Sequence, residues 1–155
     1  MHTTMPEPLM QTDLPLPGRR PGKVRDIYQA TLADGTELLV IIASDRISAF
    51  DVVMPNGIGG KGVVLTQISN FWFEMIADKL GDRLQHHVIS TDPADIPGLD
   101  EAQRTALQGR TVIGRKCNVV PIECVVRGYL AGSGWKEYQK SQSACGVQLP
   151  AGLKQ

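Results

Sequence analysis

The amino-acid sequence predicts an α+β fold whose strands pair antiparallel, and three observations lead to this prediction. Residues 23–31 and 37–43 are strand-like runs joined by a short segment with Asp34-Gly35, a pair that readily supplies the positive φ of a hairpin turn. From Thr66 the apolar residues recur at steps of three and four, which is the spacing of an amphipathic helix. Two more runs rich in β-branched residues follow, at 111–116 and 122–127.

The second strand and the first helix are expected to form the core of this fold. Residues 38–43 are apolar without alternation, so both faces of this strand should be covered. Thr66 is the expected N-cap of the helix, and Gly81 is the expected end. Its apolar residues, Phe71 and Trp72 among them, are expected to pack on the sheet and not to bind a cofactor.

Two shorter helices are predicted further along the chain. Asp100 is expected to cap a helix that runs to Gln108 and ends at Gly109. Ser133 is expected to cap another over residues 135–140, after a stretch that glycines loosen.

Composition and charge exclude several classes of protein. A chain of 155 residues with 42% hydrophobic content is typical of a globular protein. Because 16 basic residues balance 16 acidic ones, no overall field attracts nucleic acid or an anionic membrane, and neither is expected as a partner. The three cysteines form no Cys-x-x-Cys pair, which indicates a reduced, cytoplasmic protein without a zinc site.

Three segments are expected along the chain. Residues 1–21 carry four prolines and no apolar signal-peptide core, so we expect a flexible leader. Residues 22–120 should form an antiparallel β lobe with a packed helix. Residues 121–155 should begin a second α+β lobe that is incomplete, because Pro121 cannot donate to a central ladder and the chain stops in a loop.

A phosphate-binding loop is predicted where the first strand begins, at Gly22-Lys23-Val24-Arg25-Asp26. Glycine lets backbone N–H groups approach an anion closely, and Lys23 and Arg25 add positive charge. The loop lacks the Gly-Lys-Ser/Thr ending and the following helix of a P-loop. From these residues alone, a solvated basic turn remains the alternative interpretation.

Two further groups of polar residues lie at strand ends or in glycine-rich connections, where side chains often face a cleft. In the segment 45–51, Asp45 and Arg46 can form a local ion pair with Asp51 as a turn cap, or they can belong to a site. Arg127 ends a predicted strand, where its guanidinium can clamp a carboxylate or phosphate through two hydrogen bonds.

The order of four motifs closely resembles the SAICAR synthetase family, the phosphoribosylaminoimidazole-succinocarboxamide synthases of purine biosynthesis. The motifs are Gly22 to Tyr28, Ser44 to Asp51, Pro121 to Tyr129 and Gly132 to Tyr138. The resemblance runs from about Gly22 to Gln155. It implies a SAICAR synthase-like fold, with a kinase-like antiparallel β lobe and the start of an α+β ATP-binding lobe.

This resemblance also implies a reaction and its small molecules. Members of the family are ATP-dependent ligases that join the carboxylate of a carboxyaminoimidazole ribonucleotide to the amine of L-aspartate, with Mg²⁺, and give SAICAR, ADP and phosphate. The resemblance assigns ATP binding to Gly22, Lys23, Arg25 and Glu123. It assigns substrate binding to Ser48, Asp51, Arg127 and Ser133. No residue is assigned a covalent catalytic role, so Cys124 is expected to be a packed core thiol.

One departure from the family sets a limit on this interpretation. Family members continue for about as many residues again past Gln155, and the Mg²⁺ ligands are expected in that missing C-terminal half. We therefore expect these 155 residues to hold no metal and to be inactive alone. Two alternatives stay open, namely a non-catalytic nucleotide-binding module on the same scaffold and a different ATP-dependent ligase or small-molecule kinase.

Overall fold

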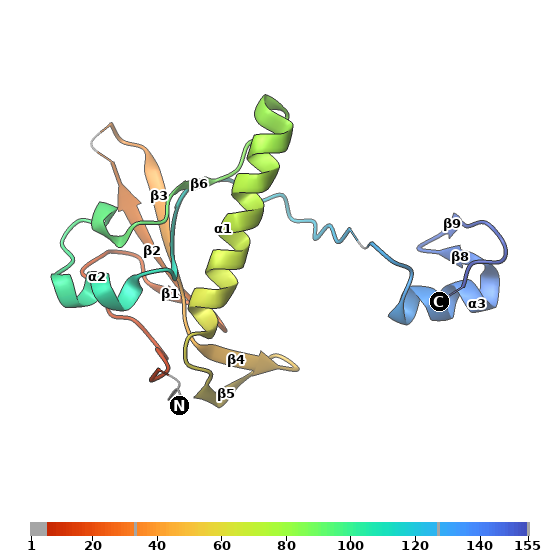
Figure 1. Ribbon diagram of the computed structural model, residues 1–155, viewed down its shortest axis with the longest axis horizontal. Coiled ribbons are helices and arrows are strands. Elements are labelled where there is room, and N and C mark those ends of the chain that lie inside the picture. Colours follow the sequence, from red (N-terminus) through yellow and green to blue (C-terminus); the bar gives the residue numbers. More distant parts are fainter. Residues whose placement is uncertain (1–5, 33, 127, 155) are drawn as a thin grey trace, which may run out of the picture. The chain divides into compact units, whose positions relative to one another are not determined.

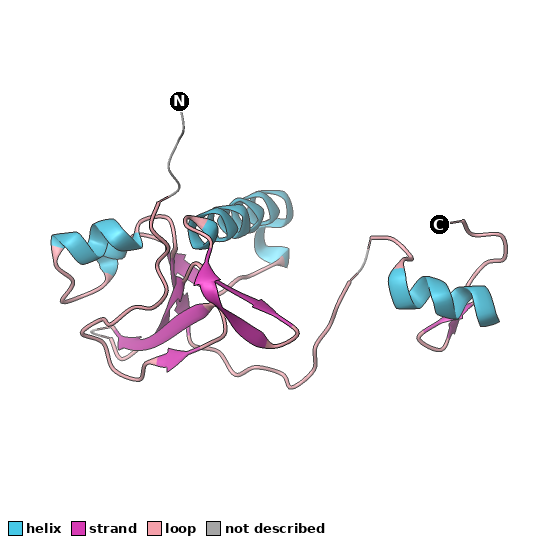
Figure 2. Cartoon of the chain, turned by 90° about the horizontal axis from the view of Figure 1, so that it is seen from below, coloured by secondary structure: helices cyan, strands magenta, loops and turns pink. Residues whose placement is uncertain are grey.

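The computed structural model describes residues 6–32, 34–126 and 128–154. The chain divides into two compact units, the first ending at Asn118 and the second beginning at Val119, and each is described by itself (Figures 1 and 2). Within the described residues, none of the helices has the length and apolar character needed to span a membrane.

The first unit is built on a five-stranded antiparallel sheet in the order β1-β2-β3-β7-β6. The strands are β1 (Arg20–Pro21), β2 (Arg25–Thr31), β3 (Glu37–Ala43), β6 (Val88–Ser90) and β7 (Thr111–Arg115). The hairpin between β2 and β3 is confirmed: Gly35 has φ 84°, and its N–H donates to the Leu32 carbonyl at 2.9 Å. A second sheet consists of the hairpin β4 (Arg46–Ala49) and β5 (Val52–Gly57).

Four helical segments complete the described part of the first unit. They are α1 (Lys61–Leu80), the short 3₁₀ turns η1 (Gly81–Arg83) and η2 (Pro93–Asp95), and α2 (Glu101–Leu107). The cap predicted at Asp100 is confirmed, since its side chain accepts from the Gln103 N–H at 2.7 Å while Gln103 accepts from the Asp100 N–H at 3.0 Å. Both halves of a capping box are therefore present.

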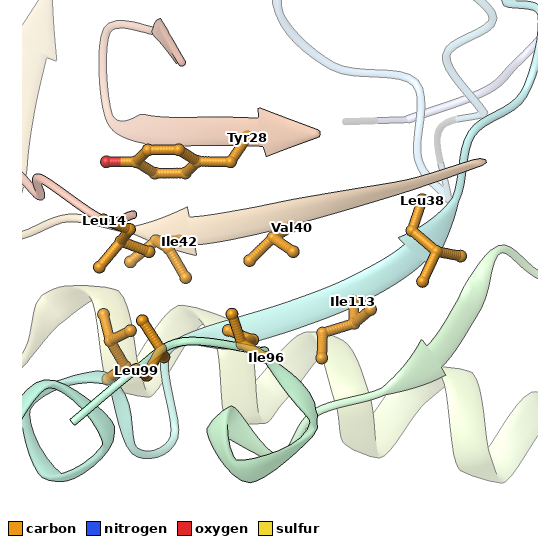
Figure 3. Close-up of a cluster of buried hydrophobic side chains, with 9 residues drawn as sticks. Leu14, Tyr28, Leu38, Val40, Ile42, Ile96, Leu99 and Ile113 are labelled. Atoms are coloured by element: carbon orange, nitrogen blue, oxygen red, sulfur yellow. The ribbon is translucent and has the colours of Figure 1, made fainter. Parts of the chain in front are cut away.

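One face of the sheet carries the hydrophobic core (Figure 3). Alternate residues of β2, β3 and β7 point into it, and η2, α2 and their connection cover it; the buried residues are Leu14, Tyr28, Leu38, Val40, Ile42, Ile96, Leu99, Leu107 and Ile113. On the opposite face, Leu39 and Ile41 are only half-buried beside α1. The prediction that β3 is covered on both faces thus holds fully on the core side and partly on the other.

The expectation of a flexible leader over 1–21 needs correction for the part of it that the structure describes. Leu14 lies in the core at 8% exposure, and Thr12 is 6% exposed. The Leu9 and Asp45 main chains also bond, with the Asp45 N–H donating to the Leu9 carbonyl at 2.8 Å. This segment therefore packs on the first unit, where Leu14 belongs to the core and Leu9 and Leu16 pack against it.

Helix α1 differs from its prediction in two ways. It begins at Lys61 and not at Thr66, because Gly60 adopts the left-handed φ of 82° that precedes it. It also buries Gly62, Thr66 and Asn70, whereas Phe71 and Trp72 remain 57% and 50% exposed. A Cβ on Gly62 would lie 2.2 Å from the Ala43 carbonyl oxygen, so the small face of the helix is the one that fits against β3.

The second unit contains α3 (Gly132–Ser141) and the short hairpin of β8 (Ser143–Ala144) and β9 (Val147–Gln148). Ala131 is the N-cap of α3 without a side-chain hydrogen bond, so the prediction of Ser133 as its cap is wrong. The strand predicted over 122–127 is not formed at 122–126, and Arg127 lies outside the described residues. Cys124 is exposed and not packed in a core.

The close approach of α1 to β3 yields a stability prediction. Gly62→Ala should lower the free energy of unfolding by about 1–3 kcal/mol, because the added methyl group meets a backbone carbonyl that cannot move aside. This reverses the usual gain from replacing a helical glycine with alanine. Denaturant unfolding monitored by circular dichroism measures it, with Val64→Ala on the exposed side of the same turn as control. An unchanged or raised stability for Gly62→Ala would contradict the packing.

Candidate functional site

The loop predicted to bind phosphate forms a tight turn between β1 and β2. The Gly22 N–H donates to the Arg25 carbonyl at 2.7 Å, and a Cβ on Gly22 would lie 3.1 Å from that same oxygen. Lys23 and Arg25 follow directly, and the Lys23 side chain is 55% exposed. The loop therefore presents cationic side chains from a backbone that glycine allows to turn closely.

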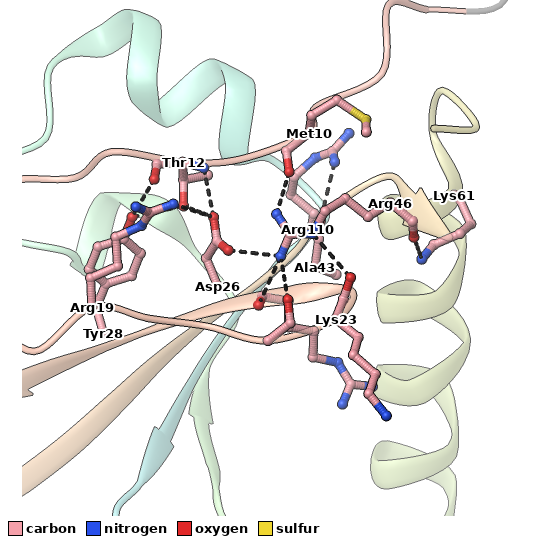
Figure 4. Close-up of polar contacts among 12 residues, drawn as sticks. Met10, Thr12, Arg19, Lys23, Asp26, Tyr28, Ala43, Arg46, Lys61 and Arg110 are labelled. Carbon is pink, nitrogen blue, oxygen red and sulfur yellow. Dashed lines mark hydrogen bonds and ion pairs between the residues drawn. The ribbon is translucent and has the colours of Figure 1, made fainter. Parts of the chain in front are cut away.

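Arg46 fixes this loop from inside the protein (Figure 4). Its guanidinium donates to the carbonyl oxygens of Gly22 at 2.9 Å, Lys23 at 3.1 Å and Arg25 at 3.1 Å, and also to that of Met10. Since the negative ends of these peptide dipoles point at Arg46, they do not face an anion on the outer side of the loop.

Asp26 in turn holds Arg46, through an ion pair of 2.8 Å. The carboxylate is fully buried, and it also accepts from the Thr12 N–H at 2.7 Å and the Thr12 hydroxyl at 2.9 Å. Burial alone would raise the pKa of Asp26, but the hydrogen bonds from Thr12 and Arg46 outweigh it and hold the pKa below its ordinary value of 3.8.

A second buried carboxylate, Asp45, ties the site to α1. It faces Arg110 through two contacts, of 3.1 Å and 3.2 Å, and accepts from the N–H groups of Gly62 and Leu9, each at 2.8 Å. Burial would raise its pKa, yet these hydrogen bonds and the Arg110 charge lower it. The local Asp45–Arg46 pair considered from the sequence is thus replaced by two long-range pairs, Asp45 with Arg110 and Arg46 with Asp26.

A cavity of about 230 Å³ opens beside this network, between α1 and the half-buried face of the sheet. Arg25 and Lys61 bring positive charge to its wall, and Thr66 and Ser69 bring hydroxyl groups. The Lys61 ammonium donates to the Arg46 carbonyl at 2.6 Å, and burial lowers its pKa below the ordinary 10.5, with Asp45 opposing and Arg25 adding to the effect. Ile41 and Val112 make other parts of the wall apolar, so the cavity suits an anion with an apolar portion.

The tip of the β4–β5 hairpin reaches the same loop. Lys23 donates to the Asp51 carboxylate at 2.7 Å, which brings together two of the predicted site residues. Phe50 and Asp51 form the turn with φ of 49° and 67°, a left-handed conformation that costs non-glycine residues about 1–3 kcal/mol each. Ser48 lies on β4, opposite Val53 and exposed.

The remaining predicted site residues belong to the second unit. Glu123 is exposed in a segment without assigned helix or strand, and Ser133 is exposed in the first turn of α3. A hollow of about 600 Å³ is lined by Ser133, Gly132, Tyr129 and their neighbours.

Sequence reasoning found the charged loop but missed the groups that hold it. The sequence alone predicts no buried ion pair for Asp26 or for Arg110. A usable signal existed for Asp26, because the alternation of β2 places it on the same face as Tyr28, which belongs to the core. Arg46 and Arg110 carried no such signal, since their partners lie 20 and 65 residues away.

The described residues do not form a metal site by themselves. Among residues 6–32, 34–126 and 128–154, no three histidine, cysteine or carboxylate side chains lie close enough together to hold an ion. Asp26 and Asp45 are each already paired with an arginine, so their oxygens do not fit a cation.

Comparison with known proteins gives a consistent result. A profile of the SAICAR synthetase family matches residues 19–155. The phosphoribosylaminoimidazole-succinocarboxamide synthase of Rhodopirellula baltica is 50% identical, over 95% of this chain and 48% of its own length. That of Syntrophotalea carbinolica is 52% identical, over 94% of this chain and 46% of its own length. The chain thus spans about half the length of these relatives.

Solved structures agree with the sequence relatives. A SAICAR-synthase from Saccharomyces cerevisiae, solved in complex with SAICAR, matches with a TM-score of 0.74 and 36% identity. The match covers 95% of this chain and 50% of the yeast chain. A second SAICAR synthase structure matches with the same TM-score and 35% identity. These matches agree with an α+β fold of the predicted kind.

The buried carboxylates predict how stability depends on pH. The pKa of Asp26 is lowered on folding. The ionised carboxylate therefore contributes fully to the free energy of unfolding above about pH 5, and this contribution is lost as the pH falls below 3.8. Asp26→Asn should therefore lower the free energy of unfolding by about 3–5 kcal/mol at pH 7, because Arg46 is left buried without its counter-charge. The loss should shrink below pH 4. Urea unfolding from pH 3 to 8 measures both effects, and Asp13→Asn, an exposed neighbour of Thr12, is the control. A loss that stays constant over this range would contradict the assignment.

Proposed function

The chain belongs to the SAICAR synthetase family, and from that premise we propose that it takes part in the ATP-dependent ligase step of purine biosynthesis. The substrates would be 5-amino-1-(5-phosphoribosyl)imidazole-4-carboxylate and L-aspartate, and the products SAICAR, ADP and phosphate. The observation that carries this proposal is the Gly22–Arg25 loop, whose carbonyl oxygens are turned toward Arg46 while Lys23 stays exposed.

In this proposal the loop binds the phosphates of ATP. Lys23 and Arg25 supply charge, and Gly22 supplies the close turn of the backbone. The cavity beside α1, with Arg25 and Lys61 in its wall, supports an anionic ligand on this face of the sheet. Glu123 lies in the segment 119–123, which follows β7, and would bind ATP near its adenine ring. This part of the assignment rests on the family alone.

The acceptor substrate would meet the loop through the β4–β5 hairpin. The 2.7 Å contact of Lys23 with Asp51 supports a place for Asp51 beside the transferred phosphate. Ser48 lies on the same hairpin, two residues before the strained turn. Arg127 and Ser133 would hold the ribonucleotide, whose phosphate and carboxylate need hydrogen-bond donors.

The chemistry needs no covalent enzyme intermediate. The ribonucleotide carboxylate attacks the γ-phosphorus of ATP, the bond to the ADP oxygen breaks, and an acyl phosphate forms. The aspartate amine then attacks the acyl carbon, phosphate leaves, and the nitrogen loses a proton to give the amide. Lys23 and Arg25 would balance the charge that develops on the phosphate oxygens, which is the main demand in phosphoryl transfer.

We also propose a cytoplasmic location. Cys117, Cys124 and Cys145 are free and exposed thiols, which fits a reducing compartment.

The first test separates phosphate binding from general nucleotide binding. Lys23→Ala should weaken ATP binding by about tenfold or more and AMP binding much less, because the ammonium should face the β- and γ-phosphates. Titration calorimetry at fixed salt measures both, with Lys116→Ala as a control on a distant exposed lysine paired with Glu37. Equal losses for ATP and AMP would contradict this placement of Lys23.

The second test concerns the acceptor. The ribonucleotide should raise the melting temperature of the wild-type chain, and Arg127→Ala should remove most of that shift by deleting a bidentate donor. A thermal-shift series with ATP, ribonucleotide and aspartate measures this, and Lys154→Ala serves as control. ATP stabilisation without any response to the ribonucleotide would favour the alternative, a non-catalytic nucleotide-binding module.

A further inference from the structure

Thr12, in the N-terminal segment, reaches the candidate site through Asp26 (Figure 4). Its N–H and its hydroxyl both donate to one oxygen of the Asp26 carboxylate, Oδ2, at 2.7 Å and 2.9 Å. Because Thr12 is 6% exposed and Asp26 is fully buried, bulk water does not compete for these bonds. Two donors on the same oxygen fix the orientation of the carboxylate.

The other oxygen of this carboxylate holds the arginine that shapes the loop. Oδ1 of Asp26 accepts from Nη2 of Arg46 at 2.8 Å. The same nitrogen donates to the carbonyl oxygens of Gly22 at 2.9 Å and Arg25 at 3.1 Å. Thr12 is therefore connected to the Gly22–Arg25 loop through two side chains, and a rotation of the carboxylate would change how the guanidinium meets the loop.

The core holds Thr12 itself in place. The buried Tyr28 hydroxyl donates to the Thr12 carbonyl at 2.8 Å, and Leu14, two residues further on, lies in the hydrophobic core. The Met10 carbonyl, two residues before Thr12, accepts from Arg46. The N-terminal segment thus joins the core to the network behind the loop, and Thr12 lies where the two meet.

The Thr12 hydroxyl also favours the charged form of Asp26. Burial raises the pKa of this carboxyl, but the hydrogen bonds from Thr12 and Arg46 outweigh burial and lower the pKa. Without the hydroxyl, the buried carboxylate would lose one of its donors, and its bond to Arg46 would weaken as well, because the bonds of such a network support one another.

We propose that Thr12 is a positioning residue for ATP binding, which holds Asp26 and Arg46 so that the Gly22–Arg25 loop keeps the shape in which its charged side chains meet the phosphates. Thr12 acts from behind the loop, through other side chains. The inference rests on the proposed function, which assigns the loop to ATP. Thr12 precedes residues 19–155, the part of the chain that the family profile matches, so its role follows from these contacts and not from the profile.

The test compares Thr12→Val, which removes the hydroxyl and keeps a similar shape, with Thr12→Ser, which retains the hydroxyl. Titration calorimetry measures the affinity of the full 155-residue chain for ATP and for AMP. We expect Thr12→Val to weaken ATP binding by about three- to tenfold and AMP binding by less than about twofold, because the β- and γ-phosphates depend on the shape of the loop. Thr12→Ser should bind both nucleotides as the wild type does.

A core variant controls for a general loss of stability. Ile96, at 1% exposure, belongs to the hydrophobic core and has no polar atom with which to join the network. Ile96→Val should lower the melting temperature and leave the ratio of the ATP and AMP affinities unchanged.

Hydrogen exchange of the free chain tests the positioning without any nucleotide. In Thr12→Val, the backbone N–H groups of residues 20–26 should exchange at least about threefold faster than in the wild type and in Thr12→Ser. Those of residues 37–43, in β3, should exchange at the wild-type rate. The comparison of the two segments separates a local change at the loop from a general loosening of the fold.

The outcomes distinguish this inference from the proposed function. Equal losses for ATP and AMP in Thr12→Val, or faster exchange in both segments, would give Thr12 a role in stability alone and overturn the proposal. Wild-type ATP affinity in Thr12→Val would overturn it as well, while the proposed function would stand. A wild-type chain that does not bind ATP would count against the proposed function, and would also overturn the role of Thr12 in ATP binding.

Discussion

The buried pair of Arg46 and Asp26 is the interaction on which the candidate site depends. An arginine side chain has five N–H donors in a fixed plane, and here they serve Asp26, three carbonyls of the Gly22–Arg25 loop and the Met10 carbonyl. Such a pair adds little net stability, because removing both charges from water is costly. Its effect is conformational: the loop adopts the one shape in which its carbonyl oxygens reach the guanidinium, and the charged side chains of the loop are left on the outer side.

Asp45 connects the surrounding elements to one another through hydrogen bonds and an ion pair. Its carboxylate and main chain bind Leu9 of the N-terminal segment, Gly62 at the start of α1 and Arg110 just before β7. Through Lys61, which donates to the Arg46 carbonyl, the first turn of α1 is also connected to the loop clamp. The two carboxylates therefore connect the Gly22–Arg25 loop, the cavity wall and the start of α1 through one hydrogen-bond network. A change at one of them is expected to reach the others, since such networks are not additive.

The features that the sequence predicted well are those fixed by neighbouring residues. The hairpin at Asp34-Gly35 and the capping box at Asp100 depend on local dihedral preferences and on bonds spanning three residues. Interactions that span tens of residues left no comparable signal. The packing of Leu14 on the core, the Arg46–Asp26 pair and the Asp45–Arg110 pair each require knowledge of which segments meet in space. The strand expected at 122–127 was wrong over its described part for a related reason, because β propensity describes a residue and a strand requires a partner.

Helix α1 shows most clearly where pattern reasoning stops. The spacing of three and four correctly predicted a helix with an apolar side, and it was natural to direct that side toward the sheet. In the structure the sheet contacts the small side of the helix instead. Helix α1 approaches β3 so closely at Ala43 that only glycine fits at position 62. Periodicity reports that a side is apolar but not which neighbour covers it. Because the small side of α1 is already occupied by β3, the apolar side remains exposed in the described part of the first unit. The Gly22–Arg25 loop is held from within by Arg46, which belongs to the same unit.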